Sequence, residues 1–167
     1  NSLTHYALRL GAPRGLVRGT STAGIHAFEV YSPRHCASAA TLDAQPSGLK
    51  TVGLLVERFS VCGEDEDTVS MALTAMHRLV RRCGVRPAEV GVLHLSPSLL
   101  DRSKSMKTQL TPLIEADGHA DLEGVDHYGA SAGGASALLS CVSWAQSESW
   151  DGRWGVAVSS NDQVAPN

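Results

Sequence analysis

Alternation of apolar and polar positions predicts the first clear strand of this chain. GIHAFEVYS (24–32) alternates in this way and is rich in strand-forming residues, and Pro33 ends it. Further strands are expected at TVGLLV (51–56), VGVLHLS (90–96) and WGVAVSS (154–160). The chain therefore carries several short strands at well separated positions.

The clearest helix follows the acidic run 64–67. Its apolar side chains recur at helical spacing: Val69, Ala72, Leu73, Met76, Leu79, Val80 and Cys83. It starts with acidic side chains and ends with basic ones (Arg78, Arg81 and Arg82), a charge distribution that complements the helix dipole. Gly84 then predicts the end of this helix.

Three further segments show weaker helical patterns. Residues 35–49 run into a Pro-Ser-Gly loop, residues 103–116 contain Pro112 as a kink or an early end, and a third helix begins near Gly133 or Gly134. Helices that alternate with strands over short connections indicate a layered α/β fold with a largely parallel sheet.

Composition and charge exclude several classes of protein. The 167 residues suffice for one domain with a sizeable core, and 43% hydrophobic with 19% charged residues is typical of a globular protein. The net charge of −3 argues against nucleic-acid binding. Because no run of about 18 apolar residues occurs, we expect no membrane span.

Cysteine and histidine spacing does not indicate a metal or a disulfide framework. The four cysteines are Cys36, Cys62, Cys83 and Cys141, and they form no C-x-x-C pair. We interpret them as free thiols of a reducing compartment. His119 and His127 lack ligand-like spacing, and His35 and Cys36 point in opposite directions along an extended chain. We therefore expect no metal and no cofactor.

The N-terminal segment is basic. Residues 1–28 contain Arg9, Arg14 and Arg18 but neither Asp nor Glu. This composition is typical of mitochondrial transit peptides, although a flexible basic tail accounts for it equally well. We therefore predict a basic extension or transit-peptide remnant over 1–22 and one domain over 23–167.

GASAGG (129–134) contains G-x-S-x-G, the spelling of a serine nucleophile elbow. The preceding segment 121–129 is a poor strand, and no histidine follows Ser131 in the sequence. Because a serine hydroxyl without a base is a weak nucleophile, the motif favours a tight loop-to-helix junction over a serine hydrolase.

Three segments carry a family resemblance. They are DRSKSMKTQL (101–110), DLEGVD with the following GASAGGA (121–135), and SWAQSESWDGRWGVAV (143–158). Their order and spacing resemble the N-terminal half of 3-hydroxy-3-methylglutaryl-CoA synthase, and the resemblance spans about residues 23–164. It implies an incomplete N-terminal half of a thiolase-like fold, with α-β-α layers and a mostly parallel sheet.

The resemblance also implies site residues. The family's acyl-accepting cysteine, in a motif close to N-A-C-x-G-G, falls on Ser131, and Gly129 replaces the asparagine. A helix N-terminus is worth about 1 kcal/mol, which does not bring a hydroxyl near ionisation. The family's general acid/base glutamate falls on Glu66, although an acidic helix start explains that residue as well.

Four departures together predict a non-catalytic relative. They are Ser131, Gly129, SPS at 96–98, and an end at Asn167 before the family's catalytic histidine. We expect a structural subunit of a larger mitochondrial protein assembly, with a respiratory-chain complex favoured over the ribosome. The alternative is the N-terminal piece of an active synthase that condenses acetyl-CoA with acetoacetyl-CoA. A third reading is an acyl-CoA-binding module, although most of the family's CoA contacts lie outside this half.

Overall fold

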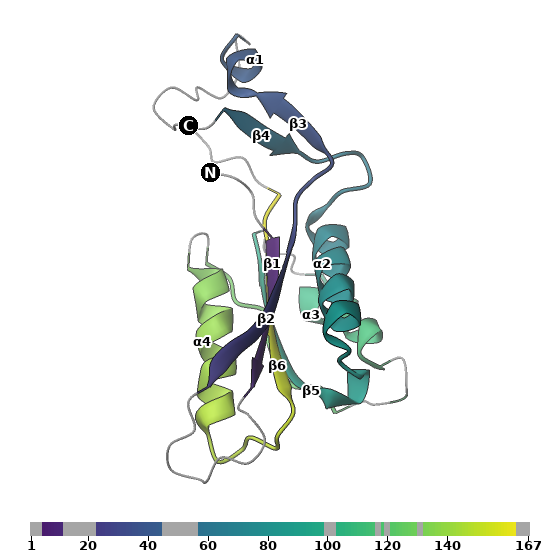
Figure 1. Cartoon of the computed structure of the whole chain (residues 1–167), viewed down its shortest axis with the longest axis vertical. Coiled ribbons are helices and arrows are strands. Elements are labelled where there is room, and N and C mark those ends of the chain that lie inside the picture. The colour runs from purple at the N-terminus through teal and green to yellow at the C-terminus, as the bar shows by residue number, and fades with distance from the viewer. Residues whose placement is uncertain are drawn as a thin grey trace.

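The computed structural model describes most of the chain. It covers residues 5–11 (backbone only), 23–44, 57–98, 103–115, 118, 121–129 and 132–162. The strand expected at 51–56 and the candidate residue Ser131 lie outside these described residues. Figure 1 shows a central sheet with α4 on one side and α2 and α3 on the other, which confirms the predicted layered α/β fold.

The central sheet has four strands in the order β2-β1-β6-β5. They are β2 (Gly24–Tyr31), β1 (His5–Gly11), β6 (Trp154–Ser160) and β5 (Val90–Pro97). β5 and β6 run parallel, whereas β1 is antiparallel to both of its neighbours. Residues 121–127 extend the sheet beside β5 through two parallel bridges, Val92 to Glu123 and Leu95 to Asp126. The three predicted strands that fall on described residues are thus confirmed.

β1 lies inside the segment predicted as a basic extension. Its backbone pairs with β2 over seven positions and with β6 over five, so it is an interior strand of the sheet. The basic extension was predicted from the composition of residues 1–28. The position of β1 in the sheet depends instead on backbone pairing with β6, which is distant in the sequence. The division of the chain at residue 23 stays a prediction.

α2 (Thr68–Cys83) begins and ends where local chemistry predicts. The Asp67 carboxylate accepts the Ser70 N–H at 2.6 Å, and the Ser70 hydroxyl accepts the Asp67 N–H at 2.9 Å, which makes a reciprocal capping box. Gly84 adopts the left-handed conformation with φ of 60° and ends the helix. Five buried residues fix α2 to the sheet: Met71, Ala72, Ala75, Met76 and Leu79.

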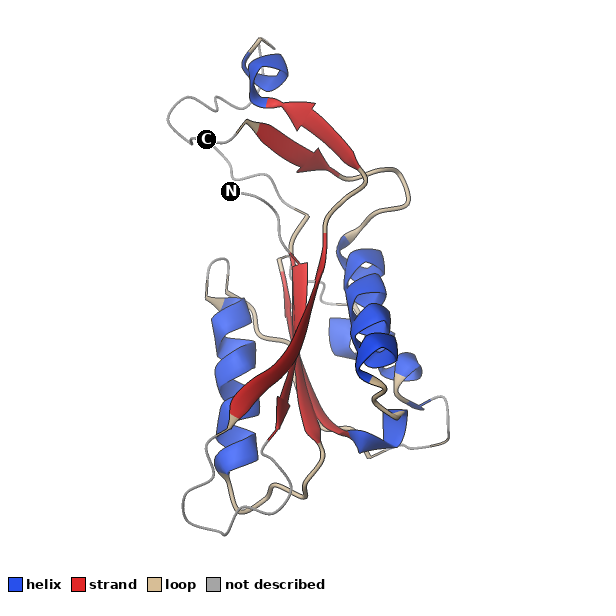
Figure 2. Ribbon diagram, in the orientation of Figure 1, coloured by secondary structure: helices blue, strands red, loops and turns tan. Residues whose placement is uncertain are grey.

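Two of the other predicted helices are shorter than their patterns suggested. The expected helix at 103–116 is α3 (Met106–Leu110) followed by the 3₁₀ turn η2 (Thr111–Leu113), because Pro112 ends the regular helix. In place of a helix at 35–49, β3 (His35–Ser38) leads into the short α1 (Ala39–Asp43). β3 pairs with β4 (Arg58–Val61) in a separate two-stranded sheet beyond one end of the central layers (Figure 2).

α4 (Gly133–Gln146) covers the opposite face of the sheet. Its Ala137 and Cys141 pack against Val92 of β5 and Ala157 of β6. A second, larger cluster on the α2 side contains Met76, Leu93 and Val156. The 3₁₀ turn η1 (Pro87–Glu89) lies between α2 and β5 and leads into β5. No helix within the described residues has both the length and the apolarity to cross a bilayer.

Candidate active site

The two long helices start at the same end of the parallel strands. The Ser160 hydroxyl at the end of β6 donates to the carbonyl of Thr68, the first residue of α2, at 2.6 Å. On the opposite face, a Cβ added at Gly133, the first residue of α4, would lie 2.3 Å from the Oγ of Ser96 near the end of β5. The carboxyl ends of parallel strands are where open α/β sheets bind ligands.

A cleft of about 200 Å³ opens at this end of the sheet. Its walls come from the first turn of α2, the end of β5, α3 and the segments that follow β5 and β6; they include Pro97, Lys104, Gln109, Tyr128 and Asp162. Ser98 donates to Asp162 at 3.0 Å and ties two of these segments together. The cleft therefore lies at the strand ends, with α2 and α3 in its walls.

Glu66 is a buried carboxylate that immediately precedes Asp67, a residue of the cleft wall. Only 7% of the residue is exposed, although Asp67 next to it is exposed and caps α2. The Tyr31 hydroxyl donates to Oε1, the Gly63 N–H donates to Oε2 at 2.8 Å, and the Arg34 N–H donates to Oε1 at 3.1 Å. Glu66 thus points away from the helix, toward β2 and the turn before α2.

These hydrogen bonds fix the ionisation of Glu66. The Tyr31 hydroxyl and then the Gly63 N–H lower the pKa of the Glu66 carboxyl to about 2, against the opposing effect of burial. The same hydrogen bond, together with burial, raises the pKa of the Tyr31 hydroxyl. Glu66 is consequently a carboxylate and Tyr31 a neutral phenol at physiological pH.

The position of Ser131 follows from the sequence alone, because the residue lies outside the described part of the chain. It comes two residues before α4, just as Glu66 comes two residues before α2. Gly129 is described, and its carbonyl accepts the Gly133 N–H at 2.9 Å. The roles predicted for Ser131 and Glu66 stay predictions.

Two other cysteines are unsuited to act as a thiolate: Cys62, close to Glu66, and Cys141, which packs against the start of β6. Burial raises the pKa of Cys141 on α4 to about 12. Burial, and then the charges of Asp162 and Glu66, also raise the pKa of Cys62. Because a thiolate is the nucleophilic form, neither residue replaces a cysteine at position 131.

A histidine pair that the sequence spacing did not reveal lies beneath the start of α4. His127 Nε2 and His94 Nδ1 are 3.1 Å apart, and burial followed by the charge of His127 lowers the pKa of His94. The two residues are 33 positions apart, and only the pairing of residues 121–127 with β5 brings them together. Among the described residues, no three His, Cys, Asp or Glu side chains gather to hold a metal.

Solved structures share the fold of this chain. The 3-oxoacyl-[acyl-carrier-protein] synthase III from Aquifex aeolicus matches with a TM-score of 0.64 at 17% identity, over 80% of this chain and 43% of that chain. At that identity the likeness shows the fold alone. MvaS in complex with 3-hydroxy-3-methylglutaryl coenzyme A matches with a TM-score of 0.71 at 25% identity, over 92% of this chain and 34% of that one.

A family model described as "Hydroxymethylglutaryl-coenzyme A synthase N terminal" matches residues 20–166, and the chain belongs to this family. A hydroxymethylglutaryl coenzyme A synthase from Fusarium sp is 38% identical over 142 residues, which are 83% of this chain and 31% of the relative. The cytoplasmic synthase of Mus musculus is 36% identical over 81% of this chain and 27% of its own length. The chain thus spans about 30% of the curated relatives it matches.

These relatives correct one prediction. The interpretation as a non-catalytic pseudoenzyme is wrong, because the chain is about 38% identical over most of its length to proteins named as synthases, which are enzymes. One of its four arguments was that the sequence ends at Asn167, and the position of that end carries no information about activity. None of the relatives described above is named as a subunit of a mitochondrial or respiratory-chain complex, so the comparisons lend that prediction no support.

Proposed function

We propose that this chain is the N-terminal part of an enzyme of the hydroxymethylglutaryl-CoA synthase type, which condenses acetyl-CoA with acetoacetyl-CoA. The observation that carries the proposal is Glu66, a buried and ionised carboxylate at the strand ends of a fold shared with such synthases. A buried carboxylate held by three hydrogen-bond donors is unusual for a purely structural helix start, and Asp67 already fills that role.

Glu66 acts as the base in this proposal. It removes a proton from the methyl carbon of the acetyl group, and the resulting enolate attacks the ketone carbon of acetoacetyl-CoA. A carbon–carbon bond forms as the π bond of the ketone opens, and the alkoxide takes up the proton that Glu66 removed. A carboxylate with a pKa of about 2 is a weak base. Each hydrogen bond that Glu66 gives up when an acyl group enters raises its pKa and therefore its basicity.

Ser131 takes the place of the acyl acceptor. Its hydroxyl oxygen attacks the thioester carbonyl, the carbon–sulfur bond breaks, coenzyme A leaves as the thiol after taking up the hydroxyl proton, and an ester forms. A hydroxyl is far less ionised than a thiol at neutral pH, so this transfer is slow. Replacing Ser131 with cysteine should accelerate it.

Transfer of label from [¹⁴C]acetyl-CoA tests the proposal in the natural polypeptide that carries this sequence. We expect slow labelling of the wild type, at least tenfold faster labelling of Ser131→Cys, and none of Ser131→Ala. Glu66→Gln should still be labelled but should lose condensation with acetoacetyl-CoA. Equal labelling of the wild type and Ser131→Ala would remove Ser131 from the reaction, and full condensation by Glu66→Gln would refute the assigned base.

We also propose a cytoplasmic location. The relatives from Mus musculus and Rattus norvegicus, both 36% identical, are named as cytoplasmic enzymes. Fractionation of cells that express the tagged natural polypeptide tests the location, since recovery in mitochondria would contradict it. Binding to other protein subunits stays a prediction, and co-purification with the same tag tests it.

A further inference from the structure

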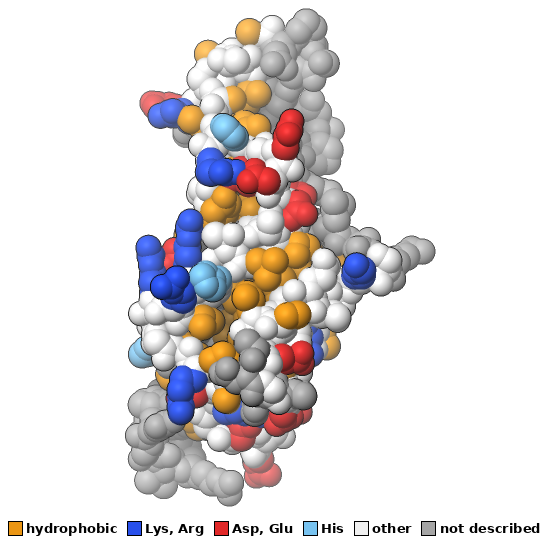
Figure 3. All heavy atoms as spheres, turned by 90° about the vertical axis from the view of Figure 1, so that its right-hand side faces the viewer, with side chains coloured by type: hydrophobic (Ala, Val, Ile, Leu, Met, Phe, Trp, Pro, Cys, Tyr) orange, Lys and Arg blue, Asp and Glu red, His pale blue; other side chains and the backbone are white. Residues whose placement is uncertain are grey.

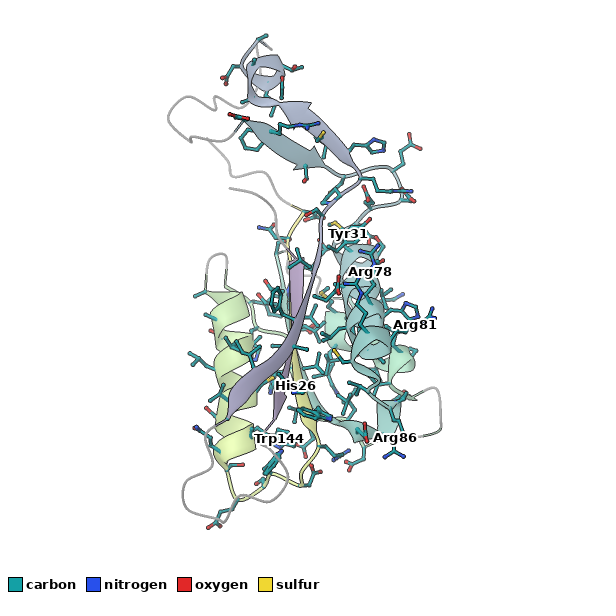
Figure 4. All side chains as sticks on the ribbon, viewed as in Figure 1. His26, Tyr31, Arg78, Arg81, Arg86 and Trp144 are labelled. Carbon is teal, nitrogen blue, oxygen red and sulfur yellow. The ribbon has the colours of Figure 1, made fainter. Side chains whose placement is uncertain are left out.

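β2 and α2 are joined by two successive contacts at matched spacing. Arg82 Nη1 lies 2.5 Å from Oε2 of the buried Glu29, and the Arg78 guanidinium carbon lies 5.2 Å from the centre of the Tyr31 ring. Two residues along a strand and four along a helix both advance about 6 to 7 Å. Figure 4 shows Tyr31 and Arg78 close together beside α2. Figure 3 views the molecule from the side on which α2 lies, and basic side chains gather along one flank of that view.

Only one of the two contacts reaches the candidate active site. The Tyr31 hydroxyl donates to Oε1 of Glu66, whereas Arg82 donates to Glu29, a different carboxylate. The remaining donors to Glu66 are the backbone N–H groups of Gly63 and Arg34, and the Arg34 side chain adds an ion pair at 3.4 Å. Tyr31 is thus the neutral side chain that orients Glu66 from across the α2–β2 junction.

We propose that Tyr31 is a positioning residue for Glu66, and that Arg78 braces the Tyr31 ring from α2. This inference rests on the proposed function, in which Glu66 is the base. A cation over an aromatic face contributes about 0.5–1 kcal/mol at an exposed site, which favours one orientation of the ring. The ring in turn directs its hydroxyl at Oε1, so α2 controls the carboxylate through Tyr31.

Electrostatics supports this arrangement. The Tyr31 hydroxyl has the largest single effect on the pKa of Glu66, and it lowers that pKa. The charges of Arg34 and Arg78 oppose the rise in the pKa of Tyr31, which keeps the phenol a better hydrogen-bond donor. Loss of the Tyr31 hydroxyl and loss of the Arg78 charge should therefore both raise the pKa of Glu66.

The test uses ¹³C NMR titration of the Glu66 side-chain carboxyl in the chain, together with the pH dependence of kcat in the natural polypeptide. Tyr31→Phe should raise the pKa of Glu66 by about one unit or more, because the hydrogen bond to the charged form is lost. It should move the acidic limb of the kcat profile by the same amount. Plateau kcat should fall about tenfold, with KM changed less than twofold, because the loss of the carboxylate's orientation outweighs its gain in basicity. Arg78→Gln should cause a smaller shift in the same direction.

Arg82→Gln is the matched control. It removes a cation from the same helix face and breaks the neighbouring contact with Glu29, but it should leave the titration of Glu66 and the kcat profile unchanged. Equal shifts in Arg78→Gln and Arg82→Gln, or no shift in Tyr31→Phe, would overturn the proposal. Arg78→Gln keeps the Tyr31 side chain, so the proposal stays testable if Tyr31→Phe does not fold.

The two proposals fail differently. Full condensation by Glu66→Gln would refute the proposed function, while the NMR shifts in Tyr31→Phe would still report the contact between Tyr31 and Glu66. If Glu66→Gln is inactive but the titration of Glu66 is unchanged in Tyr31→Phe, only the role of Tyr31 is refuted.

Discussion

Asp126 accepts the backbone N–H of Met106 at 2.7 Å, and its second oxygen accepts the N–H of Lys107 at 2.9 Å. The carboxylate thereby joins the segment that extends the sheet to the start of α3, which forms a wall of the cleft. Asp126 therefore helps to set the relative position of two walls of the cleft, together with Lys107, whose Nζ donates to the Leu122 carbonyl at 2.8 Å.

Replacing Asp126 should destabilise the chain. Asp126→Ala leaves two N–H groups without their acceptor, which costs about 1–2 kcal/mol of unfolding free energy. Urea denaturation followed by circular dichroism measures this loss. Glu123→Ala in the same segment is the control, because Glu123 is exposed and should change stability by less than about 0.5 kcal/mol. Equal losses in both variants would show that the two hydrogen bonds to Asp126 do not stabilise the chain.

Glu66 should make stability depend on acid pH. Its pKa is about 2 in the folded chain and 4.5 for an unperturbed carboxyl, so its contribution is complete above about pH 4.5. The contribution is lost as pH falls from there toward 2, where the folded state also becomes protonated. Urea unfolding of the wild type and Glu66→Gln between pH 2 and 6 checks this. The two curves should converge at low pH, and a constant difference would contradict the prediction.

His94 should also make stability depend on pH, in a range above that of Glu66. Burial and then the charge of His127 lower the pKa of His94, so the unfolded chain takes up a proton there more readily than the folded chain. Stability should therefore fall as pH drops below the ordinary histidine value of about 6.5. His94→Gln should remove this part of the dependence, measured by thermal unfolding between pH 5 and 8. The exposed His77→Gln is the control, and it should behave like the wild type.

Local signals in the sequence sufficed for part of this structure. The period of α2 and its stop at Gly84 depend on neighbouring residues, and both were predicted. The contact of Tyr31 with Glu66 spans 35 positions, so no spacing rule could reveal it. β1 was obscured for the same reason, because its partners in the sheet are distant in sequence. The resemblance identified the family, but departures such as Ser131 were taken too far as evidence of lost activity.

Gly133 should be intolerant of any side chain. A Cβ there would lie 2.3 Å from Ser96 Oγ and 2.9 Å from the carbonyl oxygen of His127, and the carbonyl belongs to backbone that cannot rotate away. Gly to Ala within a helix ordinarily gains up to about 1 kcal/mol. At Gly133 the clash should reverse the sign and cost about 1–3 kcal/mol of unfolding free energy.

Urea denaturation of Gly133→Ala and of the control Ser143→Ala measures this reversal. Ser143 lies exposed on the same helix, so its replacement should be neutral or slightly stabilising. Because Gly133 begins α4 directly after the segment that contains Ser131, the clash should also slow acetyl transfer in a Ser131→Cys background. A stabilised Gly133→Ala would show that α4 does not pack this tightly on the end of β5.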